Sequence, residues 1–180
     1  NYCTFNPWIC NSNISLSQNG LYIKGNNAHA AACGTLGIPR YGKWYFEMTR
    51  ESDSNEPMIG VKGSTLPHAT LINSNVGNPG FFVRGNEARY MDGSEYAGGW
   101  MAGFTQNKGQ TIGVAIDMDH GAFYARKPNG DWQNSGDPTS GSSKTGSLWS
   151  TLLTDIGEGD VWLPCVKVYD SGLTASVNFG

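Results

Sequence analysis

The stretch IGVAIDMDHGAFY, residues 112–124, restricts the possible folds of this chain more than any other segment. Apolar side chains at positions 112, 114, 116 and 118 alternate with small or acidic residues, which is the two-residue period of a strand with one buried face. The chain then breaks at Asp119-His120-Gly121 and continues with Phe123-Tyr124, so the pattern predicts two antiparallel strands joined as a hairpin. Nothing in this hairpin resembles catalytic machinery, and it indicates a scaffold.

Composition favours an all-β class. The chain has 25 glycines among 180 residues and 15% charged residues, and no window of about 11 residues carries a sustained apolar stripe of helical period. The net charge of -3 comes without a basic patch, which disfavours binding to nucleic acid. No apolar run approaches the roughly 20 residues needed to span a bilayer.

The length predicts one domain covering residues 1–180. Because the chain begins at Asn1 rather than Met, we expect a fragment of a longer polypeptide or a processed product. About ten short strands joined by glycine-rich turns predict two antiparallel sheets packed face to face. The predicted strands cover residues 14–17, 21–23, 28–33, 43–49, 58–61, 81–84, 88–91, 112–118, 123–124, 161–168 and 173–179.

Pairings and loops follow from the same pattern. The last two strands are expected to pair with each other as a final antiparallel hairpin, and residues 147–155 are predicted to hold one short helical turn. Residues 63–79, 92–109 and 127–147 are rich in small and polar residues, so they are interpreted as surface loops.

Several of these segments, in this order and spacing, resemble a SPRY domain, and the resemblance covers nearly the whole chain. The family pattern implies a twisted sandwich of two antiparallel sheets with a concanavalin-like jelly-roll topology and long rim loops. It also implies a non-catalytic module without a cofactor, which binds a protein or glycan ligand through those loops. The matching segments are Gly42-Lys-Trp-Tyr-Phe-Glu-Met, Met58-Ile-Gly-Val, GQTIGVAIDMD (109–119), Phe123-Tyr124, Asn129-Gly130, Leu163-Pro164 and Val177-Asn-Phe-Gly180.

The amino-terminal segments NYCTFNPW (residues 1–8) and ISLSQNGL (residues 14–21) are similar to SPRY domains in tailed-bacteriophage virion proteins. This resemblance implies a virion location and a role in receptor recognition or in contacts with neighbouring virion subunits. A purely structural capsid or tail decoration domain is one alternative. The alternative to a virion location is a soluble protein, either cytoplasmic or extracellular.

The chain departs from the family pattern in two loops. The hairpin end at residues 125–130 is two or three residues longer than usual, and the segment from 131 to 159 is also long. Because SPRY domains vary their ligand through loops, function is expected there. The family's peptide-binding residues have no motif counterpart in this chain.

Acidic residues suggest two alternative chemistries. Asp117 and Asp119 could share a calcium ion, but the further oxygen ligands of a calcium loop are missing. We favour a turn in which these side chains accept hydrogen bonds from backbone N–H groups, and we expect no metal site.

Glu47, Glu51 and Asp53 invite a glycosidase interpretation, because such enzymes use paired carboxylates. Glu47 and Glu51 share a strand face by parity, but a turn begins near Asp53, and no nucleophile motif accompanies the scattered histidines His29, His68 and His120. We therefore expect no enzyme, with a carbohydrate-binding or carbohydrate-hydrolysing domain as the alternative.

The aromatic residues divide into two groups. Those at strand positions are predicted to lie in the core, whereas those in or beside loops either pack under their loops or face a ligand. Tyr96, Trp100 and Tyr169 are the predicted exposed binding residues. The strand group is Trp44, Phe46, Phe123, Trp162 and Phe179, and the loop group is Tyr90, Tyr96, Trp100, Trp132, Trp149 and Tyr169.

The four cysteines, Cys3, Cys10, Cys33 and Cys165, do not have the close pair spacing of a zinc site. They could form two disulfides in an extracellular protein. The sequence lacks a secretory signal, and we favour the interpretation that they are small buried apolar residues.

Overall fold

The computed structural model describes residues 3–27, 30–54, 57–65, 80–84, 87–90, 105–128 and 130–180. Within these ranges the secondary structure consists of eleven strands and four short 3-10 turns. The 3-10 turns are η1 (Pro7–Ile9), η2 (Gln18–Gly20), η3 (Gln133–Ser135) and η4 (Gly141–Ser143). The predicted all-β class is confirmed.

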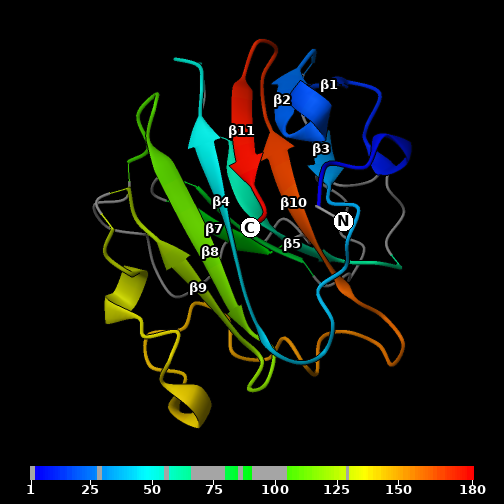
Figure 1. The fold of residues 1–180 in the computed structure, drawn as a ribbon. Helices are drawn as coiled ribbons and strands as arrows, with labels where there is room; N and C mark the ends of the chain where they lie inside the picture. The colour runs from blue at the N-terminus through cyan, green and yellow to red at the C-terminus, as the bar shows by residue number, and fades with distance from the viewer. Residues whose placement is uncertain are drawn as a thin grey trace.

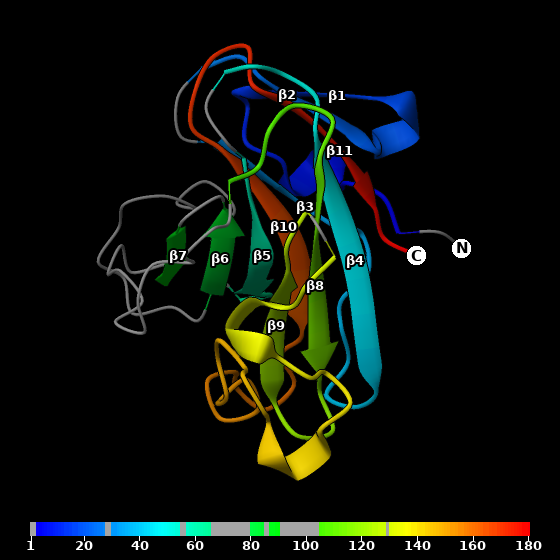
Figure 2. The same cartoon turned by 90° about the vertical axis from the view of Figure 1, so that its left-hand side faces the viewer.

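The strands form two antiparallel sheets that pack face to face (Figures 1 and 2). The six-stranded sheet has the order β1-β2-β11-β4-β8-β9. Its strands are β1 (Ile14–Ser17), β2 (Tyr22–Gly25), β11 (Thr174–Asn178), β4 (Lys43–Arg50), β8 (Thr111–Asp117) and β9 (Ala122–Arg126).

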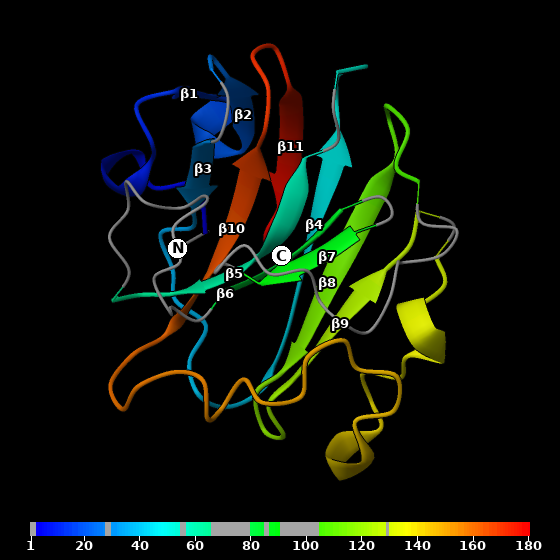
Figure 3. The same ribbon diagram turned by 180° about the vertical axis from the view of Figure 1, so that it is seen from behind.

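The five-stranded sheet has the order β3-β10-β5-β6-β7; it lies behind the first in Figure 1 and in front of it in Figure 3. Its strands are β3 (Ala30–Cys33), β10 (Trp162–Val168), β5 (Met58–Gly63), β6 (Gly80–Arg84) and β7 (Glu87–Tyr90). The predicted sandwich of two antiparallel sheets is therefore confirmed.

The core lies between the sheets. The apolar positions of β8 face it, and Ile112, Val114 and Ile116 are at most 1% exposed. Across the interface, the Trp162 ring of β10 contacts the Trp149 ring edge-on, with centroids 5.1 Å apart. Such aromatic pairs contribute about 0.5–1.5 kcal/mol beyond the apolar area that they bury.

The two hairpins with the clearest sequence signals form as predicted. β1 pairs with β2 through η2, where Asn19 and Gly20 adopt positive φ angles of 57° and 79°. Asparagine and glycine adopt this left-handed region at low cost. β8 pairs with β9 around the turn at Gly121.

The predicted pairing of the last two strands is wrong. β10 lies between β3 and β5 in one sheet, and β11 lies between β2 and β4 in the other. The connection through residues 169–173 therefore crosses from one layer to the other, because each strand turns an apolar face toward the shared core. Leu173 and Ala175 are 0% exposed on that face.

Residues 147–155 form turns rather than a regular helix. The N–H groups of Thr154 and Asp155 both donate to the carbonyl oxygen of Thr151, which makes a single hydrogen-bonded turn. The predicted short helical turn is therefore present, but it covers residues 151–155 rather than the whole of 147–155.

Trp44 is not a core residue, which corrects the prediction for the first half of its strand. The side chains of Phe46 and Met48 are buried at 4% and 0% exposure, but Trp44 on the same face is 40% exposed. Alternation places a side chain on the inner face, but it does not set where the opposing sheet ends. Phe123 and Trp162 are fully buried as predicted, and Phe179 is partly buried.

The cysteines follow neither predicted alternative. Cys33 of β3 and Cys165 of β10 are register partners and form a disulfide with a Cα–Cα distance of 4.1 Å. Both are fully buried, so the interpretation that they are reduced apolar residues is wrong for this pair. Cys3 and Cys10 are free thiols of intermediate exposure, and burial raises the pKa of Cys10 to about 11.

Candidate functional site: an apolar pocket beside Trp44

The predicted binding aromatics fall mostly outside the described residues. Tyr96 and Trp100 belong to the undescribed segment 91–104. Tyr169 follows β10 and is half-buried, and its hydroxyl donates to the Met58 sulfur at 3.1 Å. Arg84 and Lys167 each place a cation 4.6 Å from the centre of its ring. The role of the three residues in binding stays a prediction.

The other loop aromatics pack inward where the structure describes them. Trp149 is 7% exposed and stacks against Phe81 and Trp162. Trp132 is half-buried and meets the edges of the Tyr45 and Tyr124 rings. The loops that carry these two tryptophans therefore lie against the sandwich.

Asp117 shapes the β8–β9 turn, as the favoured interpretation predicts. One carboxylate oxygen accepts the N–H groups of Asp119 and His120 at 3.0 and 3.2 Å. The other accepts the His120 ring at 3.0 Å and the Lys43 ammonium group. Burial opposes ionisation, but the bonds from Lys43 and His120 outweigh it and lower the pKa of Asp117 below 3.8.

For Asp119 the prediction of a bond within the turn is wrong, because its carboxylate accepts the distant Gly42 N–H at 2.7 Å. This bond ties the turn to a second loop. Among the residues that the structure describes, no group of three or more His, Cys, Asp or Glu side chains is placed to hold a metal ion.

The carboxylates considered for glycosidase chemistry are engaged in separate interactions. Glu47 accepts a hydrogen bond from the Tyr45 hydroxyl at 2.6 Å, and Glu51 accepts one from Ser176 at 2.6 Å. Asp53, 80% exposed, pairs with Lys108 at 3.2 Å. Hydrolysis with two carboxylates requires a facing pair about 5–9.5 Å apart across one groove, whereas each of these three carboxylates is held by a different partner.

The long segment from 131 to 159 folds back onto the sandwich. Leu148 and Trp149 exchange backbone hydrogen bonds with Phe123 of the edge strand β9. Arg40 holds the far end of this segment, because its guanidinium donates to three carbonyl oxygens at 2.7–3.1 Å. These acceptors belong to Leu153, Ile156 and Gly157.

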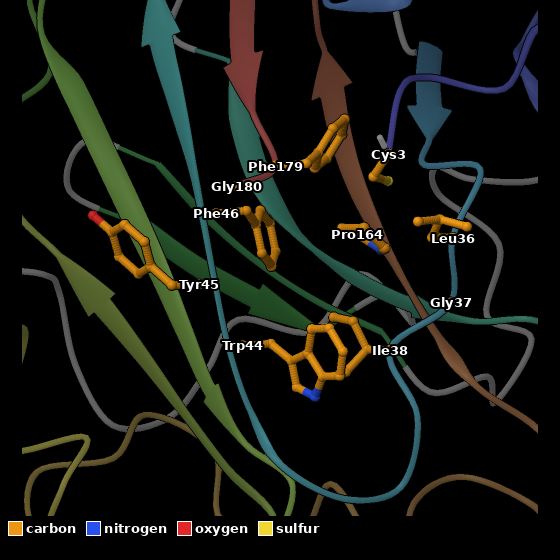
Figure 4. A pocket seen from close by; sticks show the side chains of 10 residues that line it. All are labelled: Cys3, Leu36, Gly37, Ile38, Trp44, Tyr45, Phe46, Pro164, Phe179 and Gly180. Carbon is orange, nitrogen blue, oxygen red and sulfur yellow. The ribbon is translucent and has the colours of Figure 1, made fainter. Parts of the chain in front are cut away.

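An apolar pocket of about 140 Å³ opens beside Trp44 (Figure 4). Its lining comes from β4 in one sheet, from β10 in the other and from the β3–β4 connection. Apolar cavities of about 150 Å³ accept a benzene-sized group. The lining residues are Cys3, Leu36, Gly37, Ile38, Trp44, Tyr45, Phe46, Pro164, Phe179 and Gly180.

The pocket has a buried floor and an exposed rim. Ile38 and Phe46 form the floor, each with 4% exposure, whereas Leu36 and Trp44 at the rim are 48% and 40% exposed. The Trp44 indole N–H donates to the Tyr41 carbonyl oxygen at 3.0 Å. This bond fixes the indole at the mouth, so the rim is preformed.

The backbone around the pocket requires small residues. A Cβ at Gly37 would lie 2.4 Å from a methyl carbon of Val161, so glycine lets the β3–β4 connection pass close to the segment leading into β10. Ile38 then forms an antiparallel bridge to Trp162. This contact holds the connection beside the pocket mouth.

Sequence reasoning missed this site. Trp44 was assigned to the core by its alternation with Phe46, and Leu36 lies in a short connection without a motif. The available signal was the position of Trp44 at the second residue of its strand, directly after the turn at Tyr41-Gly42. Side chains at strand ends often lie beyond the cover of the opposing sheet.

Two solved structures similar to this one are SPRY domains. The SPRY domain of human HERC1 superposes with a TM-score of 0.67 at 12% identity, and the match covers 96% of each chain. The TRIM65 PSpry domain superposes with a TM-score of 0.62 at 15% identity, covering 100% of this chain and 90% of that one. This chain therefore has the SPRY fold.

Sequence comparison finds no relative: no protein-family model and no characterised protein sequence matches the chain. In the described ranges, no helix is long and apolar enough to cross a membrane.

Proposed function

We propose that this chain is a non-catalytic SPRY-type binding module, and that its pocket beside Trp44 accepts one apolar side chain of a partner protein. The observation that carries the proposal is an exposed tryptophan held at the mouth of a preformed apolar pocket. Aromatic anchors that lose water on binding dominate the energy of protein interfaces. The SPRY fold supports a role in protein interaction.

The size of the pocket limits its occupant. A space of about 140 Å³ fits a single leucine, methionine or phenylalanine side chain rather than a whole cofactor. Burying such a side chain contributes about 1.5–3 kcal/mol. The rest of the affinity comes from contacts around the rim.

Panning a random peptide library against the purified chain tests this function. Trp44→Ala is expected to lower the affinity for the selected peptides by about tenfold or more, because the variant removes the exposed wall of the pocket. Trp8→Ala is the matched control, since Trp8 is 92% exposed and does not line the pocket. Peptides that bind the two variants equally well would refute the pocket as the binding site.

The predicted rim residues belong to the same test. Alanine substitution of Tyr96, Trp100 and Tyr169, one at a time, distinguishes a loop site from the pocket. A selected peptide that is sensitive to these changes and indifferent to Trp44→Ala supports the loops instead.

We also propose that the module belongs to a virion protein of a tailed bacteriophage, where it contacts the host surface or neighbouring subunits. The support is the similarity of residues 1–8 and 14–21 to such proteins. Genes for tail or capsid proteins beside the parent reading frame are the expected observation. A parent gene in a cellular operon unrelated to phage would contradict this context.

A further inference from the structure

A second surface lies on the outer face of the six-stranded sheet, and it shares Tyr45 with the lining of the pocket. Here Glu47, Gly113 and Arg126 are register partners across β4, β8 and β9. Gly113 has no side chain, so the centre of this row is open. The neighbouring Tyr45 side chain fills it.

The Tyr45 ring lies directly on the backbone of Gly113. A Cβ at Gly113 would come within 2.4 Å of the Tyr45 hydroxyl oxygen and 2.9 Å of two ring carbons. Figure 4 shows the ring pointing away from the other pocket side chains and across β8. The ring thus lies against the sheet at Gly113, and Tyr45 remains 40% exposed.

Two polar side chains, Glu47 and Arg126, bond the hydroxyl group of Tyr45. The hydroxyl donates to Glu47 at 2.6 Å and accepts from the Arg126 guanidinium at 3.3 Å. Arg126 and Glu47 are themselves 3.7 Å apart, with side-chain exposures of 43% and 26%. The ring is therefore fixed before any ligand arrives, and both charged groups still reach solvent.

Trp132 adds a wall to this floor. Its ring stands at 72° to the Tyr45 ring, with centroids 6.3 Å apart. An antiparallel bridge between Trp132 and Arg126 fixes the wall to the edge strand β9. Floor, wall and the ion pair together form an open corner that we name the Tyr45 platform, made of Tyr45, Glu47, Gly113, Arg126 and Trp132.

We propose that the Tyr45 platform binds a neutral saccharide. The apolar C–H face of a pyranose ring stacks on the exposed face of Tyr45, and its edge meets Trp132. Sugar hydroxyls donate to the free oxygen sites of Glu47 and accept from the N–H groups of Arg126. This second activity does not require the proposed protein partner, although Tyr45 also lines the pocket.

The charge balance of the platform favours a sugar over other flat ligands. Glu47 and Arg126 neutralise each other, so the platform offers no net charge for phosphate or for an ammonium group. A proline-rich peptide requires a groove between parallel aromatic ridges, whereas here the two rings are steeply inclined. A saccharide needs one aromatic face with a donor and an acceptor beside it, and the platform supplies both.

Saturation-transfer NMR with a panel of uncharged oligosaccharides containing glucose, galactose or N-acetylglucosamine tests the proposal. Transfer to the pyranose C–H protons of at least one panel member is expected, and Tyr45→Ala weakens its binding by about tenfold or more. Tyr45→Phe keeps the flat floor and binds within about threefold of the unmodified chain. Tyr41→Ala is the matched control, because Tyr41 is 70% exposed and lies outside the platform.

Two results would overturn the proposal. One is that no panel member shows transfer at millimolar concentration, or that transfer persists unchanged in the folded Tyr45→Ala variant. The other is that proline-rich peptides, tested by the same measurement, bind in a way that is lost in Tyr45→Ala while the sugars do not bind. Because Trp44→Ala leaves the platform intact, failure of the saccharide test is distinguishable from failure of the pocket.

Discussion

The disulfide between Cys33 and Cys165 makes a quantitative prediction about stability. It closes a loop with a sequence separation of 132 residues. In the chain-entropy treatment, such a loop removes roughly 17 cal/mol/K from the unfolded state, which corresponds to about 5 kcal/mol at 25 °C. Disulfides removed from proteins usually cost about 2–5 kcal/mol, so the calculated value is the upper end of the expected loss.

The loss converts to a shift of the melting temperature. For a chain of this length, 1 kcal/mol corresponds to roughly 2–4 °C, so adding a reductant lowers Tm by about 4–20 °C. Circular dichroism melts with and without reductant measure this shift. The paired variant Cys33→Ala/Cys165→Ala melts low in both conditions, whereas Cys3→Ser/Cys10→Ser keeps the full response to reductant.

A count of free thiols provides the decisive check. The denatured, unreduced chain exposes two reactive thiols if the bond is present, because Cys3 and Cys10 are free. Four thiols, or a Tm that does not respond to reductant, would refute this account of the β3–β10 pair.

Three further predictions concern charged side chains. Since the pKa of Asp117 is held below 3.8, its carboxylate stabilises the fold above about pH 4, and this contribution disappears as the pH falls through the folded pKa. Urea unfolding at a series of acidic pH values is expected to show that the stability of Asp117→Asn depends less on pH than that of the unmodified chain. The same pH dependence in both would contradict the assignment. Burial lowers the pKa of Lys62 in the folded chain to about 8, whereas in the unfolded chain it has the ordinary lysine value near 10.5. Between these two pH values the unfolded chain binds more protons than the folded chain, so the free energy of unfolding rises from about pH 8 to 10.5. The same unfolding assay finds no such rise in Lys62→Met, and a rise that survives the substitution would show that another group causes it. Arg40→Ala removes the donor to three carbonyl oxygens within residues 153–157. Limited proteolysis is therefore expected to cut this segment faster in the variant than in the unmodified chain, and at an intermediate rate in Arg40→Lys. Equal cleavage rates would mean that other contacts hold the segment.

Local patterns predicted the elements of this fold because their physical causes are local. The alternation at residues 112–118 reflects the pleat of one strand, and the turn at Asn19-Gly20 reflects the backbone freedom of those two residues. The role of Asp117 in the turn could also be predicted from the sequence, since its carboxylate accepts hydrogen bonds from backbone N–H groups only two and three residues further along the chain. The order of the motifs was enough to predict the SPRY fold.

Contacts between distant segments were not accessible in the same way. Alternation in residues 173–179 shows a buried face equally well whether the strand pairs with β10 or with β4, so the sequence predicted the strand but not its neighbours. The Cys33–Cys165 bond depends on the register between β3 and β10, whose cysteines are 132 residues apart in the sequence. Spacing along the chain contains no information about it.

Both candidate binding surfaces illustrate this division. By itself, the sequence determined that β4 is a strand whose successive side chains point to opposite faces, which separates Trp44 from Tyr45. Only the tertiary structure decided that the opposing sheet stops short of Trp44, leaving it 40% exposed at a pocket mouth. Only the register with β8 placed Gly113 beneath the Tyr45 ring. The physical reason is that periodicity sets the direction of a side chain, whereas the packing of distant segments sets what that side chain meets.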